Sequence, residues 1–138
     1  TLTIVGSGPA QQELQATAPD NVIFAGEIQA FDQFHHYHAL CLISESEGLP
    51  MSALEAKAHE MPLLLSDVGG CHELIEEGNG ILCENTSDSI RHSLHQLIAN
   101  LHMMQSAARE SAPNAWLEPA KMDYLHAYLG KKSGAFDL

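Results

Sequence analysis

Two carboxylates, Glu47 and Glu55, lie eight positions apart around a turn that opens a helix. The short apolar run before them, residues 39–43, is typical of a buried parallel strand. Gly48 and Pro50 then break the chain, and proline is tolerated in the first turn of a helix. Free backbone N–H groups at such a helix start can bind phosphate oxygens. A carboxylate further along can accept hydrogen bonds from sugar hydroxyls, so this segment predicts a ligand with both groups.

The composition is that of one globular domain. With 138 residues, 45% of them apolar, the chain can bury a core and resembles neither a disordered tail nor a disulfide scaffold. The net charge of −12 argues against nucleic acid or an anionic membrane as partners. No apolar run approaches the roughly 20 residues of a membrane helix, and no signal peptide is recognisable. We therefore expect a cytoplasmic location, which includes the inner face of the membrane.

The domain is expected to cover residues 1–129, followed by a flexible tail over 130–138. Thr1 falls inside a predicted strand, so we expect the sequence to be a piece of a longer protein. The three cysteines have no CxxC spacing and indicate no zinc site. His35, His36 and His38 would point in different directions on a helix, so we expect no metal site. We also expect no cofactor.

Apolar strands and amphipathic helices alternate along the sequence. This order predicts an α/β fold, Rossmann-like, in which a parallel sheet has helices on both faces. The expected strands cover residues 2–5, 22–25, 40–43, 61–65 and 81–83. The expected helices cover about residues 10–18, 28–38, 50–60, 71–76, 87–111 and 118–129.

Four loops that contain glycine follow the predicted strands, at residues 6–8, 26–27, 45–50 and 67–70. Ligands of an open parallel sheet bind beyond the carboxyl ends of its strands, so we expect these loops to converge on one rim. Gly6 and Gly8 could also open a dinucleotide-binding turn, with Glu27 about twenty residues on as a ribose ligand. Gln11 replaces the third glycine of that motif, which disfavours a dehydrogenase.

The complete set of motifs resembles the C-terminal, donor-binding half of a retaining GT-B glycosyltransferase, of the group 1 family. That family includes glycogen synthases, sucrose-phosphate synthases and lipopolysaccharide transferases. The matching segments occur in the family's order: IVGSGP at 4–9, VIFAG at 22–26, SESEGLP at 44–50, LEA at 54–56, SDVGGCHELI at 66–75 and GIL at 80–82. Glu47 and Glu55 match the two acids of the family's E-x7-E motif.

The resemblance implies a nucleotide-diphosphate sugar as the donor, with its sugar transferred in retained configuration to a saccharide or lipid-linked acceptor. The implied pathway is bacterial cell-surface polysaccharide synthesis. Glu47 would be catalytic and lie near the transferred sugar, and Glu55 would hold the ribose hydroxyls. The other implied donor-binding residues are those of the four loops: Gly6, Gly8, Gly26, Glu27, Gly48, Leu49, Pro50, Gly69 and Gly70.

This chain departs from the family in its charges and its extent. The basic residues that neutralise the diphosphate would precede Leu2, and the N-terminal acceptor domain is missing, so we expect these residues alone to be inactive. Any membrane contact would come from that missing half. Lys57 lies near the site in sequence, but helical spacing does not aim it clearly inward. Two alternatives stay open: a GT-B sugar-nucleotide epimerase or phosphorylase, and a non-catalytic remnant that binds a partner. Glu47 could also cap the helix.

Overall fold

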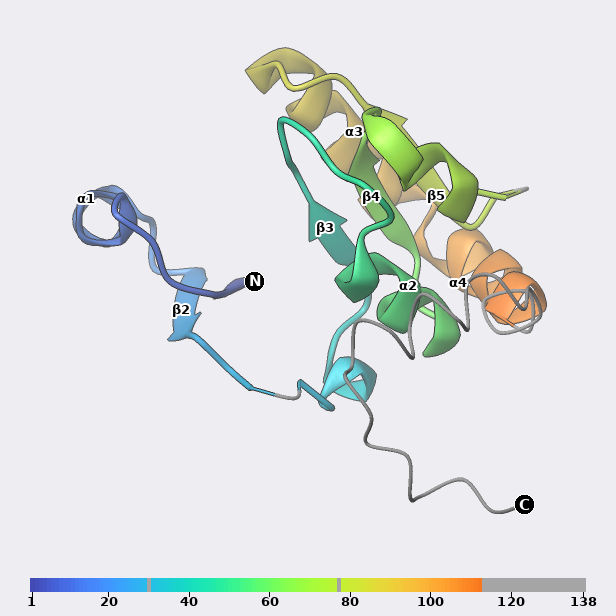
Figure 1. Ribbon diagram of the computed structural model, residues 1–138, viewed down its shortest axis with the longest axis horizontal. Coiled ribbons are helices and arrows are strands. Elements are labelled where there is room, and N and C mark those ends of the chain that lie inside the picture. The colour runs from blue at the N-terminus through green and yellow to red at the C-terminus, as the bar shows by residue number, and fades with distance from the viewer. Residues whose placement is uncertain (30, 77, 113–138) are drawn as a thin grey trace. The chain divides into compact units, whose positions relative to one another are not determined.

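The computed structural model describes residues 1–29, 31–76 and 78–112, which form two compact units, one over residues 1–33 and one from residue 34 onward (Figure 1). Each unit contains parallel strands connected through helices, so the predicted α/β class is confirmed. The predicted helix at 118–129 and tail at 130–138 lie outside the described residues. In the described part of the chain, no helix is both long enough and apolar enough to cross a membrane.

The first unit is a β-α-β crossover. Strand β1 (Leu2–Val5) pairs in parallel with β2 (Val22–Gly26), and helix α1 (Gln11–Thr17) connects them. The register shifts at the end of β1, which places Val5 opposite Gly26 and brings the two strand ends together. Helix α1 buries none of its residues, so this unit keeps much of its apolar surface exposed.

The second unit contains the main core. Three parallel strands lie in the order β3 (Leu40–Leu42), β4 (Leu63–Ser66) and β5 (Gly80–Cys83), with β4 in the centre (Figure 1). All four residues of β4 are buried, as expected of a central parallel strand. Side chains alternate between the faces of a sheet, so Leu64 packs with Cys83 and Leu97 on one face while its neighbours in β4 point to the other.

Helices cover both faces of this sheet. Helix α2 (Met51–Ala58) contacts β3 and β4, and buries Ala53 and Leu54. Helix α3 (Ser87–Ala99) contacts β4 and β5 on the face that carries Leu64. Thr86 caps α3, because its hydroxyl oxygen accepts a hydrogen bond from the backbone N–H of Ser89, at 3.2 Å.

The predicted helix over residues 28–38 is wrong. Among the described residues of that segment, only the short 3-10 helix η1 (Phe34–His36) is helical. Phe34 is buried and its ring stacks on that of His59, with centroids 4.7 Å apart. Since His, Phe, Tyr and Asp all have modest helix propensity, this single buried anchor fixes the segment without a continuous helix.

The long helix predicted over residues 87–111 is two helices. Helix α3 ends at Ala99, and α4 (Leu101–Ser111) begins after Asn100. The side-chain amide of Asn100 donates to the backbone carbonyl of Gln96, at 2.9 Å. Asparagine side chains compete with the helical backbone for hydrogen bonds, which explains the break. The helix predicted over 71–76 is likewise a 3-10 helix, η2 (Gly69–Leu74).

Candidate functional site

Two of the four predicted loops touch each other in the second unit. The turn at Gly69 and Gly70 lies on the backbone of Glu47 and Gly48, and the N–H of Gly70 donates to the carbonyl of Gly48, at 2.8 Å. A Cβ on Gly69 would lie 1.7 Å from the carbonyl oxygen of Glu47, and one on Gly70 would lie 2.5 Å from that of Gly48. Gly69 also has a φ of +51°, so this approach depends on glycine.

The two remaining loops touch each other in the first unit. The N–H of Gly6 donates to the carbonyl of Gly26, at 2.7 Å, and both glycines have positive φ, of +127° and +72°. Gly8 accepts the N–H of Gln11, at 3.1 Å, where α1 begins. Glu27 directly follows Gly26 at the end of β2, and its side chain is exposed. The strand ends of this unit therefore present two glycine turns and one carboxylate side by side.

The carboxylate of Glu47 is half-buried and held by a hydroxyl. The Oγ of Ser44 donates to Oε1 of Glu47, at 2.6 Å. Cys71, the first residue after the glycine turn, is buried, and burial raises the pKa of its thiol, with the negative charge of Glu47 adding to the rise. The thiol therefore stays protonated at neutral pH, and Glu47 faces a neutral neighbour.

Three polar residues that the motifs did not assign to the site support the same loop. The buried hydroxyl of Ser66, the last residue of β4, accepts the N–H of Ser44 at 2.9 Å and donates to Oδ1 of Asn85 at 2.5 Å. The amide of Asn85 donates to the carbonyl of Ser44, at 2.6 Å. Each of these residues follows or ends a strand, and that position could have identified all three. Ser44 and Ser66 also begin the matched segments 44–50 and 66–75, whereas Asn85 lies outside the matched segments.

Helix α2 begins where the loop ends. Pro50 is buried and precedes the helix, and its carbonyl accepts the N–H of Leu54, at 3.0 Å. Glu55 lies on α2 and is half-buried; burial raises the pKa of its carboxyl, and the nearby His59 lowers it. The convergence of Glu55 with Glu47 on one rim stays a prediction.

Three of the six basic residues fall in the described part of the chain, and each is paired with a carboxylate. Lys57 is only 3% exposed, and its Nζ lies 2.5 Å from Oε1 of Glu76. Arg91 pairs with Asp88, and Nε of Arg109 lies 3.5 Å from Oε2 of Glu60. Lys57 is therefore occupied by its own ion pair, away from any role as a counter-ion of a bound diphosphate.

Replacing Lys57 by methionine in the whole protein is expected to cost about 2 kcal/mol of stability. Removing one partner of a buried pair costs about 3–5 kcal/mol, and we expect less here because the side chain of Glu76 is 35% exposed. Urea denaturation measures the loss. Arg91→Met, which breaks an exposed pair, serves as the control and should cost under about 0.5 kcal/mol. Equal losses for the two variants would contradict the assignment.

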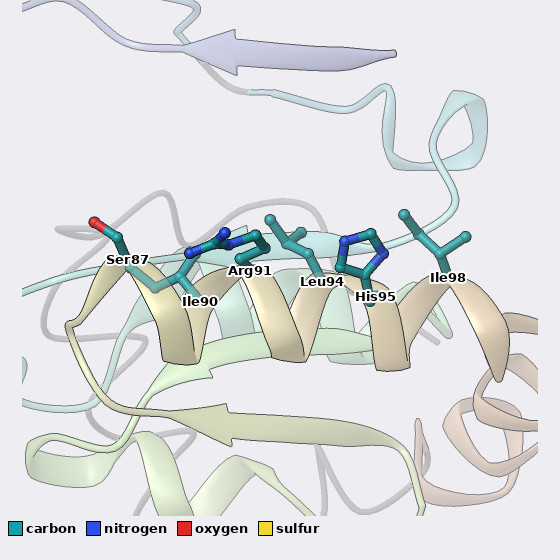
Figure 2. Close-up of a pocket in the computed structure, with 6 residues that line it drawn as sticks. All are labelled: Ser87, Ile90, Arg91, Leu94, His95 and Ile98. Carbon is teal, nitrogen blue, oxygen red and sulfur yellow. The ribbon is translucent and has the colours of Figure 1, made fainter.

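Two surface hollows are lined by no residue of the four loops. Figure 2 shows the first, along one side of α3, where Ile90, Leu94 and Ile98 form an apolar stripe beside Arg91 and His95. The second includes His35 and His36 near the start of the second unit, together with His59, Glu60 and Arg109. Neither is lined by Glu47 or Glu55. Over residues 1–29, 31–76 and 78–112, no group of three or more His, Cys, Asp and Glu could hold a metal ion.

Sequence comparisons find one family and several related proteins that match most of the chain. Residues 1–100 match the family described as "Glycosyl transferases group 1". The chain is 42% identical over 132 residues to the O-antigen biosynthesis glycosyltransferase WbnH of Escherichia coli. The aligned stretch covers 94% of this chain and 39% of that protein. An uncharacterized glycosyltransferase of Haemophilus influenzae is 32% identical over 108 residues, 72% of this chain and 31% of its own length. The chain thus spans about two-fifths of these curated relatives or less.

Solved structures share the architecture at lower sequence identity. HepE of Anabaena, solved with UDP, matches with a TM-score of 0.71 and 18% identity, over 94% of this chain and 40% of its own. The pneumococcal O-GlcNAc transferase GtfA, solved with UDP and GlcNAc, gives a TM-score of 0.72 and 22% identity, over 92% and 28%. The sucrose-phosphate synthase of Thermosynechococcus elongatus gives 0.69 and 23%, over 93% and 38%.

Proposed function

Because the chain belongs to the glycosyl transferases group 1 family and shares the α/β fold of a part of GT-B glycosyltransferase structures, we propose that it is the C-terminal, donor-binding part of a glycosyltransferase. The whole protein would transfer a sugar from a nucleotide-diphosphate sugar, with retention of configuration. The acceptor would be a saccharide or lipid-linked saccharide of a cell-surface polysaccharide. The O-antigen names of the relatives support this pathway.

The contact of the glycine turn with the Glu47 loop carries the proposal. Gly69 and Gly70 hold the backbone of Glu47 and Gly48 so closely that no side chain fits between them. A backbone fixed in this way is a preorganised surface for a ligand whose charge develops during the reaction. We assign Glu47 to the transferred sugar, and the main chain at Gly48 and Leu49 to the sugar or phosphate. The predicted donor contacts of Gly6, Gly8, Gly26 and Glu27 remain predictions.

The charges of the chain support a further part of this proposal. A leaving nucleoside diphosphate needs cations nearby, and every Lys and Arg in the described ranges lies in an ion pair with a carboxylate. The compensating cations would therefore come from elsewhere in the whole protein, together with the acceptor domain. We expect residues 1–138 alone to bind the donor weakly and to transfer no sugar.

Assays of the whole protein test the proposal. Purified protein is incubated with UDP-, GDP- and ADP-sugars and a series of saccharide acceptors, and the products are identified by mass spectrometry. NMR of the new glycosidic linkage then gives its anomeric configuration, which should equal that of the donor. An epimerised sugar nucleotide, or a product with inverted configuration, would contradict the proposal.

Glu55 gives a prediction that separates binding from stability. Burial raises the pKa of its carboxyl, so the folded protein binds more protons than the unfolded chain between the two pKa values. Stability contributed by this group is therefore present below the unfolded pKa and is lost as the pH rises through the folded pKa. At pH 7, Glu55→Gln is expected to be at least as stable as the wild type.

The same variant is expected to bind nucleotide about tenfold to a hundredfold more weakly, because hydrogen bonds from ribose hydroxyls to a charged group are worth about 1.5–3 kcal/mol. Thermal denaturation at pH 4 and pH 7, with calorimetric titration of the nucleotide, measures both effects. Glu84→Gln, at an exposed position directly after β5, is the control for the change in charge. Unchanged nucleotide affinity in Glu55→Gln would remove Glu55 from the site.

A further inference from the structure

We propose that Ser66 and Asn85 are positioning residues that fix the orientation of Glu47 through Ser44, an inference that rests on the proposed role of Glu47 in transfer. Neither Ser66 nor Asn85 belongs to the glycine turns or to the pair of acids. Their hydrogen bonds instead converge on Ser44, the residue from which the Glu47 loop departs. The proposal concerns how the loop is held, because neither side chain is assigned a contact with the donor.

The hydrogen bonds form a closed ring around the backbone of Ser44. Its N–H donates to the Oγ of Ser66, the hydroxyl of Ser66 donates to Oδ1 of Asn85, and the amide of Asn85 donates back to the carbonyl of Ser44. Every donor in this ring has one acceptor, so the orientations of the Ser66 hydroxyl and the Asn85 amide are determined by each other. Hydrogen bonds linked in series polarise and strengthen one another.

The ring also ties together the ends of all three strands of the sheet. Ser44 lies just after β3, Ser66 ends β4, and Asn85 lies just after β5. Beyond the ring, the Oγ of Ser44 donates to Oε1 of Glu47, at 2.6 Å. Two successive sets of hydrogen bonds therefore connect this carboxylate to the sheet: those of the ring to the backbone of Ser44, and that of the Ser44 hydroxyl to Glu47. A displacement of Ser44 would move Glu47 with it.

The exposure of Asn85 separates this role from a role in the core. Ser66 is fully buried, so its loss would disturb packing, whereas Asn85 is exposed and its side chain can be shortened without leaving a cavity. A change at Asn85 should therefore loosen the Glu47 loop while the fold stays intact. Displacement of a reacting group by about 1 Å can lower the rate of an enzyme by about a hundredfold, so the kinetic effect should be measurable.

The test compares Asn85→Ala with Asn100→Ala in the whole protein. Both wild-type amides donate to a backbone carbonyl from an exposed or half-exposed position, but Asn100 lies between α3 and α4 and bonds Gln96. We expect Asn85→Ala to lower kcat about tenfold, with the donor KM changed less than about twofold. The melting temperature should fall by only a few degrees, because the buried hydroxyl of Ser66 loses its acceptor. In hydrogen exchange, the peptide covering residues 43–49 should exchange faster in Asn85→Ala and at the wild-type rate in Asn100→Ala.

A double-mutant cycle with Ser44→Ala tests whether Asn85 affects transfer through Ser44. If Asn85 acts through Ser44 and Glu47, adding Asn85→Ala to Ser44→Ala lowers kcat no further, whereas independent effects would multiply. Multiplying effects, or equal exchange rates in Asn85→Ala and Asn100→Ala, overturn the inference. A wild-type protein that transfers no sugar would instead overturn the proposed function, and the exchange rates would still decide whether the ring holds the loop.

Discussion

Replacing Glu47 by glutamine in the whole protein is expected to lower kcat for sugar transfer by about 10²–10³-fold, with little change in the KM for the donor. Glutamine keeps the size of the side chain and can still accept the hydrogen bond from Ser44, so the variant removes the charge alone. Loss of one preorganised group that stabilises developing charge typically costs about this factor. Initial rates over a range of donor concentrations, for wild type and variant, measure both parameters.

Glu45→Gln is the matched control for this experiment. Glu45 lies two residues earlier in the same loop and is exposed, so its replacement changes the net charge equally without touching the contact to Ser44. We expect its kcat to stay within about twofold of the wild-type value. A Glu47→Gln variant that matches Glu45→Gln, or that raises only KM, would show that Glu47 serves uniform binding or caps α2.

The sequence was sufficient to predict the elements that carry strong local signals. The apolar run of β4 and the glycine turns identified a parallel sheet with loops at the carboxyl ends of its strands, and the structure has β3, β4 and β5 in parallel. The turn at Gly69 could be recognised because glycine suits the positive φ that it has here. Such features depend on the conformational preferences of the residues themselves, so they can be predicted without knowledge of distant contacts.

Features that depend on contacts between distant residues could not be predicted. The ion pair of Lys57 could not be predicted, because its partner Glu76 is nineteen residues away along the chain. The ring of Ser44, Ser66 and Asn85 joins residues up to 41 positions apart, and each of them alone is an ordinary surface-type polar residue. The helix prediction over residues 28–38 was wrong for the same reason. Phe34 is held by stacking on His59, a distant residue that the periodicity of the segment does not include.

Replacing Gly69 by alanine is expected to destabilise the whole protein by about 3 kcal/mol and to abolish most transfer activity. Alanine at a left-handed φ costs about 1–2 kcal/mol, and the new methyl group would lie 1.7 Å from the carbonyl oxygen of Glu47. Relief requires the Glu47 loop to move, and forcing extra atoms into packed structure costs about 1–3 kcal/mol. The melting temperature and kcat should therefore fall together.

Two neighbouring glycines turn this prediction into a graded series. A methyl group on Gly70 would lie 2.5 Å from the carbonyl oxygen of Gly48, at a backbone conformation that alanine can adopt, whereas one on Gly48 meets nothing within 4 Å. The loss of stability should decrease from Gly69→Ala through Gly70→Ala to Gly48→Ala, and the last variant should melt at the wild-type temperature or slightly above it, because alanine restricts the unfolded chain. Since the glycine turn and the Glu47 loop meet through their backbones, loss of this order would mean that the two loops do not lie in contact in solution. Wild-type activity in Gly69→Ala would separate that contact from catalysis.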